Sequence, residues 1–151
     1  IRDSLSVKSN ILGVAERNFL EKEDLINFYQ NTIKEFGLES IEDSMGYVLS
    51  GGQRRKVEIA RCLASKPKII LLDEPFAGID PLAIQDIKNV LKSLSDKGIC
   101  ILITDHNLRE TIDICNYSIV IKDGSILDKG EKDYLINSSL IKEEYFGTVF
   151  D

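Results

Sequence analysis

Two short apolar runs constrain the fold of this chain more than any other feature. The first, Ile69–Leu72, leads directly into Asp73 and Glu74, and the second, Ile99–Ile103, precedes a polar segment that contains His106. Continuous rather than alternating runs of this kind are typical of strands buried on both faces of a parallel sheet. Both runs are far shorter than the roughly 20 apolar residues that a membrane-spanning helix needs. We therefore predict two buried strands.

The segment between the two runs predicts a helix. Asp80 followed by Pro81 is typical of a helix cap and first turn, and Gly98 marks the end. The apolar residues between them follow helical spacing and are Ile84, Ile87, Leu91 and Leu94. A strand, a helix and a second strand form a parallel crossover, which brings both carboxyl ends to one edge of the sheet. Because ligands of open α/β sheets bind at that edge, we expect Glu74 and His106 to lie near a ligand.

The residues before the first strand predict helices. Ser4 or Ser6 can cap a short first helix, and apolar residues within 25–36 follow helical spacing. A capped helix over 53–65 precedes the first strand. We expect residues 1–66 to form a helical subdomain that contains this capped helix.

The residues after the second strand predict smaller elements. A helix over 108–115 is followed by an Asp123-Gly124 dipeptide, which favours the turn of a β-hairpin. Short helical pieces are expected from Glu131 onward. We therefore predict an α/β chain in which residues 67–151 form the sheet-containing part.

Charge and cysteine content limit the partners and the compartment. The chain has 25 acidic and 19 basic residues, a net charge of -6, and a single basic cluster, Arg54–Lys56, which we interpret as a solvated helix face. Nucleic acid is disfavoured as a partner, because neutralising phosphates requires a clustered basic face. Cys62, Cys100 and Cys115 have no paired or metal-ligand spacing. They are expected to be reduced, buried thiols of a cytoplasmic protein.

The segment Leu49–Gln53 places a hydroxyl and two adjacent glycines at the start of a predicted helix. Amide N–H groups and the helix dipole favour an anion there, and glycines let a phosphate of another molecule approach the backbone. Ser50 followed by Gln53 also fits a capping box, which needs no ligand. The two interpretations are compatible, and both stay open.

Asp73 and Glu74 end a predicted buried strand, where a phosphate-bound Mg²⁺ and an attacking water require a metal-side acid and a base. The alternative is a strand that simply enters a solvated loop, although Pro75 restricts where the carboxylates point. His106 is the only histidine. A single histidine is more often structural than catalytic, but its position after the neighbouring strand favours a contact with a γ-phosphate or with the water near Glu74.

In this order and spacing, these segments resemble the ABC ATPase family, the nucleotide-binding subunits of ATP-driven transporters. Leu49–Gln53 is similar to the family signature, Ile69–Glu74 to the Walker B strand, Ala77–Asp80 to the D-loop and His106 to the switch histidine. The resemblance implies a partial P-loop NTPase fold. In that fold a helical subdomain is followed by the Walker B half of the parallel-sheet core.

The resemblance also implies roles for individual residues. Those that would serve ATP held by a second, identical subunit are Ser50, Gly51, Gly52 and Gln53. Asp73 would support Mg²⁺, Glu74 would act as the base toward water, Asp80 would couple the two sites of the dimer, and His106 would hold the γ-phosphate. The helical segment before Ser50 would receive integral membrane subunits, and the protein would be cytoplasmic, peripheral on the inner face of the cytoplasmic membrane.

One family element is missing from the sequence. No glycine is followed by Lys, so the chain contains no G-x-x-x-x-G-K-[ST] loop to cradle phosphates, and it begins with Ile1 rather than Met. We interpret it as a piece of a longer ATPase. Alone, it is expected to bind ATP weakly or not at all, and not to hydrolyse it.

Further segments suggest a branch of the family. The ATPases of bacterial lipopolysaccharide exporters are similar in Asp43–Gly46, Val57–Arg61, Asp73–Gly78 and Ile103–Thr111. ATPases of branched-chain amino-acid importers are similar in much of the same sequence and remain an alternative. Two other classes are a soluble ABC protein that acts on nucleic acid or ribosomes, which the acidic balance disfavours, and a non-catalytic interaction module, which Asp73, Glu74 and His106 together disfavour.

Overall fold

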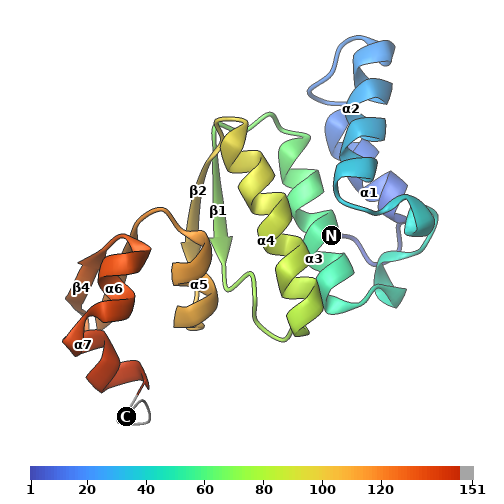
Figure 1. Cartoon of the computed structure of the whole chain (residues 1–151). Helices are drawn as coiled ribbons and strands as arrows, with labels where there is room; N and C mark the ends of the chain where they lie inside the picture. Colours follow the sequence, from blue (N-terminus) through green and yellow to red (C-terminus); the bar gives the residue numbers. More distant parts are fainter. Residues whose placement is uncertain (147–151) are drawn as a thin grey trace. The chain divides into compact units, whose positions relative to one another are not determined.

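The computed structural model describes residues 1–146 (Figure 1). The chain divides into two compact units, the first spanning Ile1–Leu102 and the second beginning at Ile103. Each unit is described on its own. The division expected at residue 66 stays a prediction.

The first unit opens with two helices. α1 (Val7–Ala15) is capped by Ser6, whose hydroxyl accepts from the Ser9 amide at 3.1 Å, and α2 (Lys22–Glu35) carries the predicted apolar face. The largest side chains buried here are Ile11, Phe36 and Leu38. Gly37 has a φ of 58°, which a glycine adopts readily, and it ends α2 as predicted.

Two short 3-10 helices, η1 (Glu39–Ile41) and η2 (Gly46–Val48), lead to α3 (Gly51–Leu63). The predicted range for α3, 53–65, is two residues late at both ends. The helix starts earlier because Ser50 is the cap residue, and the first helical position directly follows a cap. The early end follows from Lys66, whose φ of 51° is incompatible with a helix.

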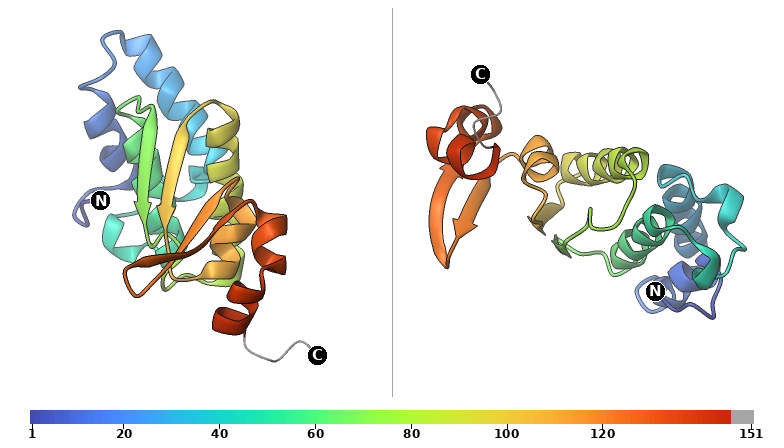
Figure 2. Two further views of the ribbon diagram at one scale, coloured as in Figure 1. Left: turned by 90° about the vertical axis from the view of Figure 1, so that its left-hand side faces the viewer. Right: turned by 90° about the horizontal axis from the view of Figure 1, so that it is seen from below.

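The predicted strand, helix and strand are present as β1 (Ile69–Asp73), α4 (Pro81–Asp96) and β2 (Cys100–Thr104). β1 and β2 are hydrogen-bonded neighbours, beginning with the Cys100 amide, which donates to the Lys68 carbonyl at 3.0 Å. The predicted stripe of α4 is buried. In Figure 2, α3 and α4 cover the same face of β1.

The prediction that both strands are buried on both faces is wrong for this chain. Ile69 is 59% exposed and Leu71 72%, whereas Ile70 between them is buried. Leu102 of β2 is 58% exposed. Within residues 1–102 the helices cover only one face of β1, so the alternate side chains, which point to the other face, remain in contact with solvent.

The prediction of buried cysteines is also wrong. The three thiols form no disulfide in this structure, but Cys62 and Cys100 are exposed and Cys115 is half-buried. Cys62 lies on the outer side of α3, and Cys100 begins β2 on its uncovered side. Residue type favoured burial, but the position within each element determined exposure.

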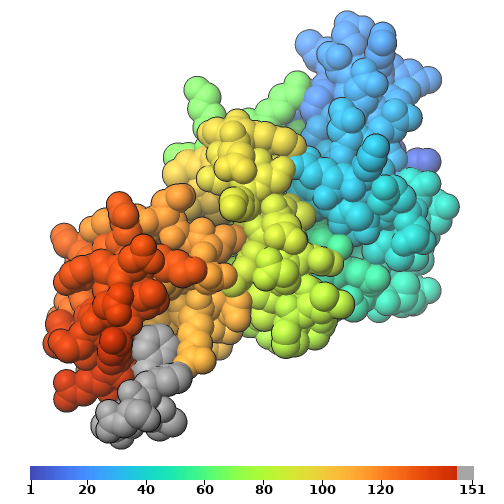
Figure 3. Space-filling model, viewed as in Figure 1, coloured from blue at the N-terminus to red at the C-terminus, as the bar shows by residue number. Residues whose placement is uncertain are grey.

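The α2 and α4 helices are joined by polar contacts. Ser93 Oγ donates to Glu35 Oε1 at 2.7 Å, and Lys97 Nζ does so at 2.5 Å. Figure 3 shows the surfaces of the two helices meeting on this face. These contacts connect the helical segment with the strand-containing segment inside the first unit.

The second unit contains α5 (Leu108–Ile114) and a β-hairpin, β3 (Ser118–Lys122) and β4 (Ser125–Gly130). Asp123 and Gly124 form the turn with positive φ, which confirms the predicted hairpin. Then follow α6 (Lys132–Asn137), α7 (Ser139–Ile141) and a short π-helix, η3 (Lys142–Phe146). The core of this unit is formed by Ile112, Val120, Leu135 and Ile141.

The predicted helical pieces after Glu131 are therefore present up to residue 146, and residues 147–151 lie outside the described part. In residues 1–146, none of the helices combines the length and apolar character that spanning a membrane requires.

Candidate functional site

The signature segment begins α3 with a complete capping box. Ser50 Oγ accepts from the Gln53 amide at 3.3 Å, and Gln53 Oε1 accepts from the Ser50 amide at 2.9 Å. The structural interpretation of Ser50 and Gln53 is thus confirmed, because two amides that a helix start leaves without partners are satisfied. The hydroxyl and the exposed Gly51 still lie at the positive end of the helix dipole, where an anion is favoured.

The two glycines of this segment differ in their surroundings. Gly51 is exposed, and an added Cβ would lie 3.4 Å from the Gly78 carbonyl oxygen. Gly52 is buried, and an added Cβ would lie 2.5 Å from Cβ of Ala83 in α4. The start of α3 therefore packs directly against the loop and helix that follow β1.

That loop, residues 74–80, has an unusual first residue. Glu74 has a φ of 46°, in the left-handed region that non-glycine residues rarely adopt. Its carbonyl oxygen accepts from Arg55 Nη2 at 3.2 Å and from the Ala77 amide at 3.2 Å. Backbone conformations of this kind cost about 1–3 kcal/mol and persist where surrounding contacts hold them. The direction of the Glu74 side chain is consequently set by a backbone turn that the hydrogen bonds from Arg55 and Ala77 stabilise.

Asp80 closes the loop by capping α4. Its carboxylate accepts from the Ala83 amide at 3.0 Å, and Pro81 occupies the first helical turn, as predicted. The side chain of Asp80 thus has a structural partner within its own chain. Asp73 is the last residue of β1 and is exposed.

The prediction that the basic cluster is a solvated helix face is wrong. Arg55 forms an ion pair with Glu58 at 2.8 Å in addition to its contact with Glu74, Arg54 pairs with Asp3, and Lys56 Nζ lies 3.7 Å from Asp86. All three basic side chains are half-buried. The Arg55–Glu58 pair has the local i,i+3 spacing of a helix, but Asp3 and Asp86 lie far away in the sequence, so no local pattern indicated those two partners.

The first unit thus brings the signature segment into contact with both ends of the loop that follows β1. Arg55, two residues after the segment, contacts the first residue of the loop. Gly51 and Gly52 lie against Gly78 and Ile79 near the end of the loop and against Ala83 in α4. The sequence analysis named the two motifs but did not predict the contacts that Arg55 and Ala83 make between them. The spacing of Arg55 one turn after Gly52 on the same helix is the only signal that could have suggested the Arg55 contact.

His106 belongs to the second unit. Its imidazole is 73% exposed, and Nδ1 lies 3.9 Å from Oδ1 of Asp105, whose side chain is fully buried. Asp105 also accepts from the Asn107 amide at 2.8 Å, and Asn107 caps α5. The imidazole therefore projects from a turn that Asp105 fixes. That His106 and Glu74 share one edge remains a prediction.

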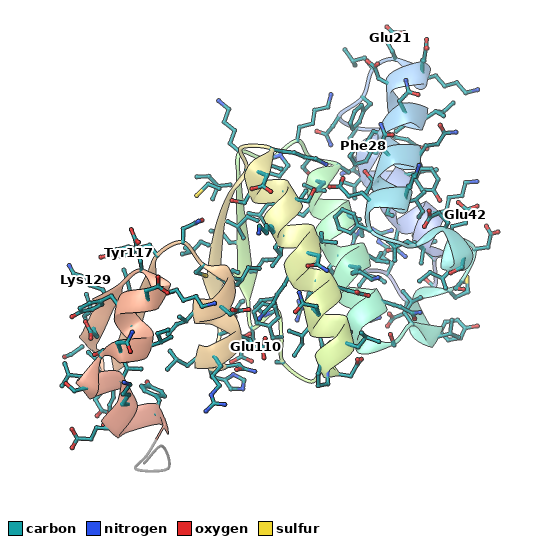
Figure 4. All side chains as sticks on the ribbon, viewed as in Figure 1. Glu21, Phe28, Glu42, Glu110, Tyr117 and Lys129 are labelled. Atoms are coloured by element: carbon teal, nitrogen blue, oxygen red, sulfur yellow. The ribbon has the colours of Figure 1, made fainter. Side chains whose placement is uncertain are left out.

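A cavity of about 690 Å³ lies between α1, α2 and η1. Its apolar lining comes from Leu12, Leu25, Ile26, Tyr29 and Ile33, and its charged lining from Lys8, Lys22, Lys34, Glu39 and Glu42. Two of its lining residues are hydrogen-bonded, because the Tyr29 hydroxyl donates to Glu42 at 2.6 Å (Figure 4 labels Glu42). Burial and this hydrogen bond raise the pKa of Tyr29 above its usual value, so the hydroxyl stays protonated.

No cluster of three or more histidine, cysteine, aspartate or glutamate side chains suitable for a metal ion occurs among residues 1–146. An Mg²⁺ ion that keeps its waters and binds nucleotide phosphates needs only one or two carboxylates from the protein. The exposed carboxylate of Asp73 fits that requirement.

The chain belongs to the ABC transporter family, which is matched by residues 2–77. It is 43% identical, over 97% of its length, to the lipopolysaccharide export system ATP-binding protein LptB of Haemophilus influenzae, and equally to that of Escherichia coli K12. The chain spans 61% of the length of these relatives.

Solved structures support the same family. The chain superposes with a TM-score of 0.76 and 28% identity on the ADP conformation of an ATP-binding cassette of an ABC transporter, covering 96% of this chain and 64% of that one. For cbiO1 of Clostridium perfringens, part of the ABC transporter complex cbiONQ, the TM-score is 0.82, the identity 28% and the coverage 93% and 56%. The fold is therefore that of part of an ATP-binding cassette, which confirms the predicted fold class.

Proposed function

We propose that this chain is part of the ATP-binding and hydrolysing subunit of a bacterial ABC transporter. The observation that carries the proposal is the contact between the signature segment and the loop after β1. An anion site at a helix start and a carboxylate pair are thereby held together in one unit. Relatives and solved neighbours whose names include ATP-binding or ADP support a nucleotide as the ligand.

The roles follow from the chemistry of each group. Ser50, with the exposed Gly51 amide, would bind the γ-phosphate of ATP held by a second, identical subunit. Asp73 would supply a carboxylate to Mg²⁺, which offsets phosphate charge. Glu74 would accept the proton of the attacking water, and His106 would donate to the γ-phosphate. Asp80 would act at the boundary between the two subunits.

Gln53 and Gly52 receive less direct roles. Gln53 completes the capping box and so orients the Ser50 hydroxyl and its amide. Gly52 is buried beside Ala83, which puts it behind the exposed surface that a phosphate would approach. In this proposal the cofactors remain ATP and Mg²⁺.

The transported substrate is proposed from the relatives alone. Both relatives are named as the ATP-binding protein of a lipopolysaccharide export system. We therefore propose lipopolysaccharide as the substrate of the whole transporter. Integral membrane subunits would then bind to the cavity between α1 and α2, whose apolar lining fits a helix of a partner. In that arrangement the protein would lie on the cytoplasmic face of the membrane.

The catalytic assignment is tested by Glu74→Gln in an ATPase that combines this chain with a phosphate-binding loop. Turnover is expected to fall by about a thousandfold, because an amide does not accept the proton, while ATP binding persists. Asp133→Asn, an exposed acid in α6, is the matched control and should hydrolyse ATP normally. Near-normal hydrolysis by Glu74→Gln would show that another group is the base.

The 151-residue chain alone is expected to bind ATP weakly or not at all, because it contains no glycine-rich loop with a lysine. Calorimetric titration with Mg-ATP measures this directly. Micromolar, Mg²⁺-dependent binding would contradict the proposal that ATP binding requires a glycine-rich loop with a lysine.

A further inference from the structure

Gly52 is held in a position where only glycine fits. Its neighbours lie close on the side where a side chain would begin: an added Cβ would lie 2.5 Å from Cβ of Ala83 and 3.6 Å from Cγ2 of Ile79. Real Cβ atoms do not approach one another this closely, so either α3 or α4 would have to shift. The direction of this missing side chain is into the chain, away from solvent.

Gly51, one residue earlier, provides the contrast. It is exposed, and an added Cβ would make van der Waals contact with the Gly78 carbonyl oxygen at 3.4 Å and Cγ1 of Ile79 at 3.8 Å. A methyl group there therefore fits inside the chain. Of the two signature glycines, only Gly52 is required by internal packing.

Ala83, against which Gly52 packs, cannot move freely. Ala83 lies in the first turn of α4, where its amide donates to the Asp80 carboxylate at 3.0 Å. The next residue, Ile84, is buried in the core. Displacing Ala83 would therefore displace the Asp80 cap together with the start of α4.

We propose that Gly52 and Ala83 form a packed joint that fixes the signature segment to the loop ending at Asp80, and that Ala83 is a positioning residue. The part concerning ATP rests on the proposed function. Ser50 would serve the nucleotide of a second subunit and Glu74 that of its own, and the joint makes the segments that carry them move together. Ala83 acts on Ser50 and Asp80 by packing, without touching the nucleotide.

The joint itself is tested by unfolding the 151-residue chain in four forms: wild type, Gly52→Ala, Ala83→Gly and the double variant. Gly52→Ala is expected to lower the thermal midpoint strongly, and Ala83→Gly to lower it less, by the cost in backbone entropy of a glycine in a helix. The double variant should be more stable than Gly52→Ala, because removing the Ala83 methyl makes room for the new one. If Gly52→Ala does not fold and the double variant does, that result also shows that removing the Ala83 methyl makes room for the new methyl group.

A matched control separates the contact from the general effect of adding a methyl group to a helix. Gly13 in α1 has no atom within 4 Å of an added Cβ, so Gly13→Ala should leave the midpoint unchanged or raise it. The contact can also be tested from the other side, because Ala83→Val should destabilise the chain while Gln85→Val, at an exposed position of α4, should not. Additive losses in the double variant would overturn the joint.

The positioning role is tested by kinetics in the ATPase that also contains the phosphate-binding loop. Gly52→Ala should lower kcat by about tenfold or more, and Ala83→Gly in the same protein should restore most of it, with little change in the KM for ATP. A double variant that regains stability but stays as slow as Gly52→Ala would show that Gly52 serves phosphate approach instead, which overturns the proposal. If the wild type hydrolyses no ATP, the proposed function fails, and the unfolding comparison still decides the joint.

Discussion

A glutamate with a positive φ is rare, and Glu74 adopts one at the end of β1. The carbonyl oxygen of Glu74 is held by Arg55 and by the Ala77 amide, so the turn that directs its carboxylate depends on a side chain from α3. The sequence indicated the acid, its strand and the capping box at Ser50, because each is encoded within a few neighbouring residues. It did not indicate Arg55, because that contact spans 19 residues and exists only after α3 and β1 have packed.

This contact predicts that Arg55→Met slows ATP hydrolysis in the ATPase that contains a phosphate-binding loop. Loss of one charged donor in a half-buried position is worth about 1 kcal/mol, so kcat should fall about fivefold. ATP binding should be unchanged, because Arg55 contacts the backbone of Glu74 and no predicted ligand position. Single-turnover kinetics measure the effect.

Arg17→Met, an exposed position after α1, is the matched control and should hydrolyse ATP like the wild type. Equal rates for both variants would mean that the turn at Glu74 holds its shape without Arg55.

At the scale of elements, the observed helices and strands agree with the predicted ones where a few neighbouring residues encode the start, end or turn. Asp80 and Pro81 start α4, Gly37 ends α2, and the Asp123-Gly124 turn forms the hairpin. The exposed face of β1 was not predictable, because an apolar run does not reveal how many of its faces the surrounding chain covers. The contact between α2 and α4 could not be predicted from the sequence either, because Glu35 and Lys97 are far apart in it.

That contact predicts a pH-dependent stability. Burial opposes ionisation of Glu35, but hydrogen bonds from Lys97 and Ser93 outweigh it, so its pKa lies below the ordinary 4.5. A carboxylate with a lowered folded pKa stabilises the fold fully above its unfolded pKa, and this contribution is lost as the pH falls through the folded value. Urea unfolding from neutral to acid pH should show this loss in the wild type.

The matched variants are Glu35→Gln and Glu39→Gln, the second being an exposed acid in η1. Glu35→Gln should be less stable than the wild type at neutral pH, and the difference should shrink in acid. If Glu39→Gln behaves in the same way, the pH dependence does not arise from the contact between α2 and α4.

For the whole molecule, the uncovered face of β1 and β2 is the most consequential feature. Ile69, Leu71 and Leu102 expose apolar surface together, and exposed apolar sheet surface promotes association. The family relationship was predictable from four motifs in order, but the exposure of this face was not, because an apolar run does not show which of its faces other elements cover.

We therefore expect the isolated chain to self-associate at high concentration. Leu71→Lys should raise the monomer fraction in sedimentation velocity, because a charge resists transfer from water to an apolar contact. Leu82→Lys is the matched control, as Leu82 is equally exposed but lies on α4, and it should leave association unchanged. A wild type that is monomeric at every concentration would contradict this expectation.

The capping box at Ser50 has a consequence for which ions this chain can recognise. A serine oxygen accepts hydrogen bonds through its lone pairs and donates one through its hydrogen, and here the Gln53 amide occupies an accepting position. The hydroxyl is thereby polarised toward donation, and the neighbouring helix amides are donors too. Under the proposed function, this set of donors would favour acceptor-rich species such as phosphates over cations, whether or not a second subunit is present.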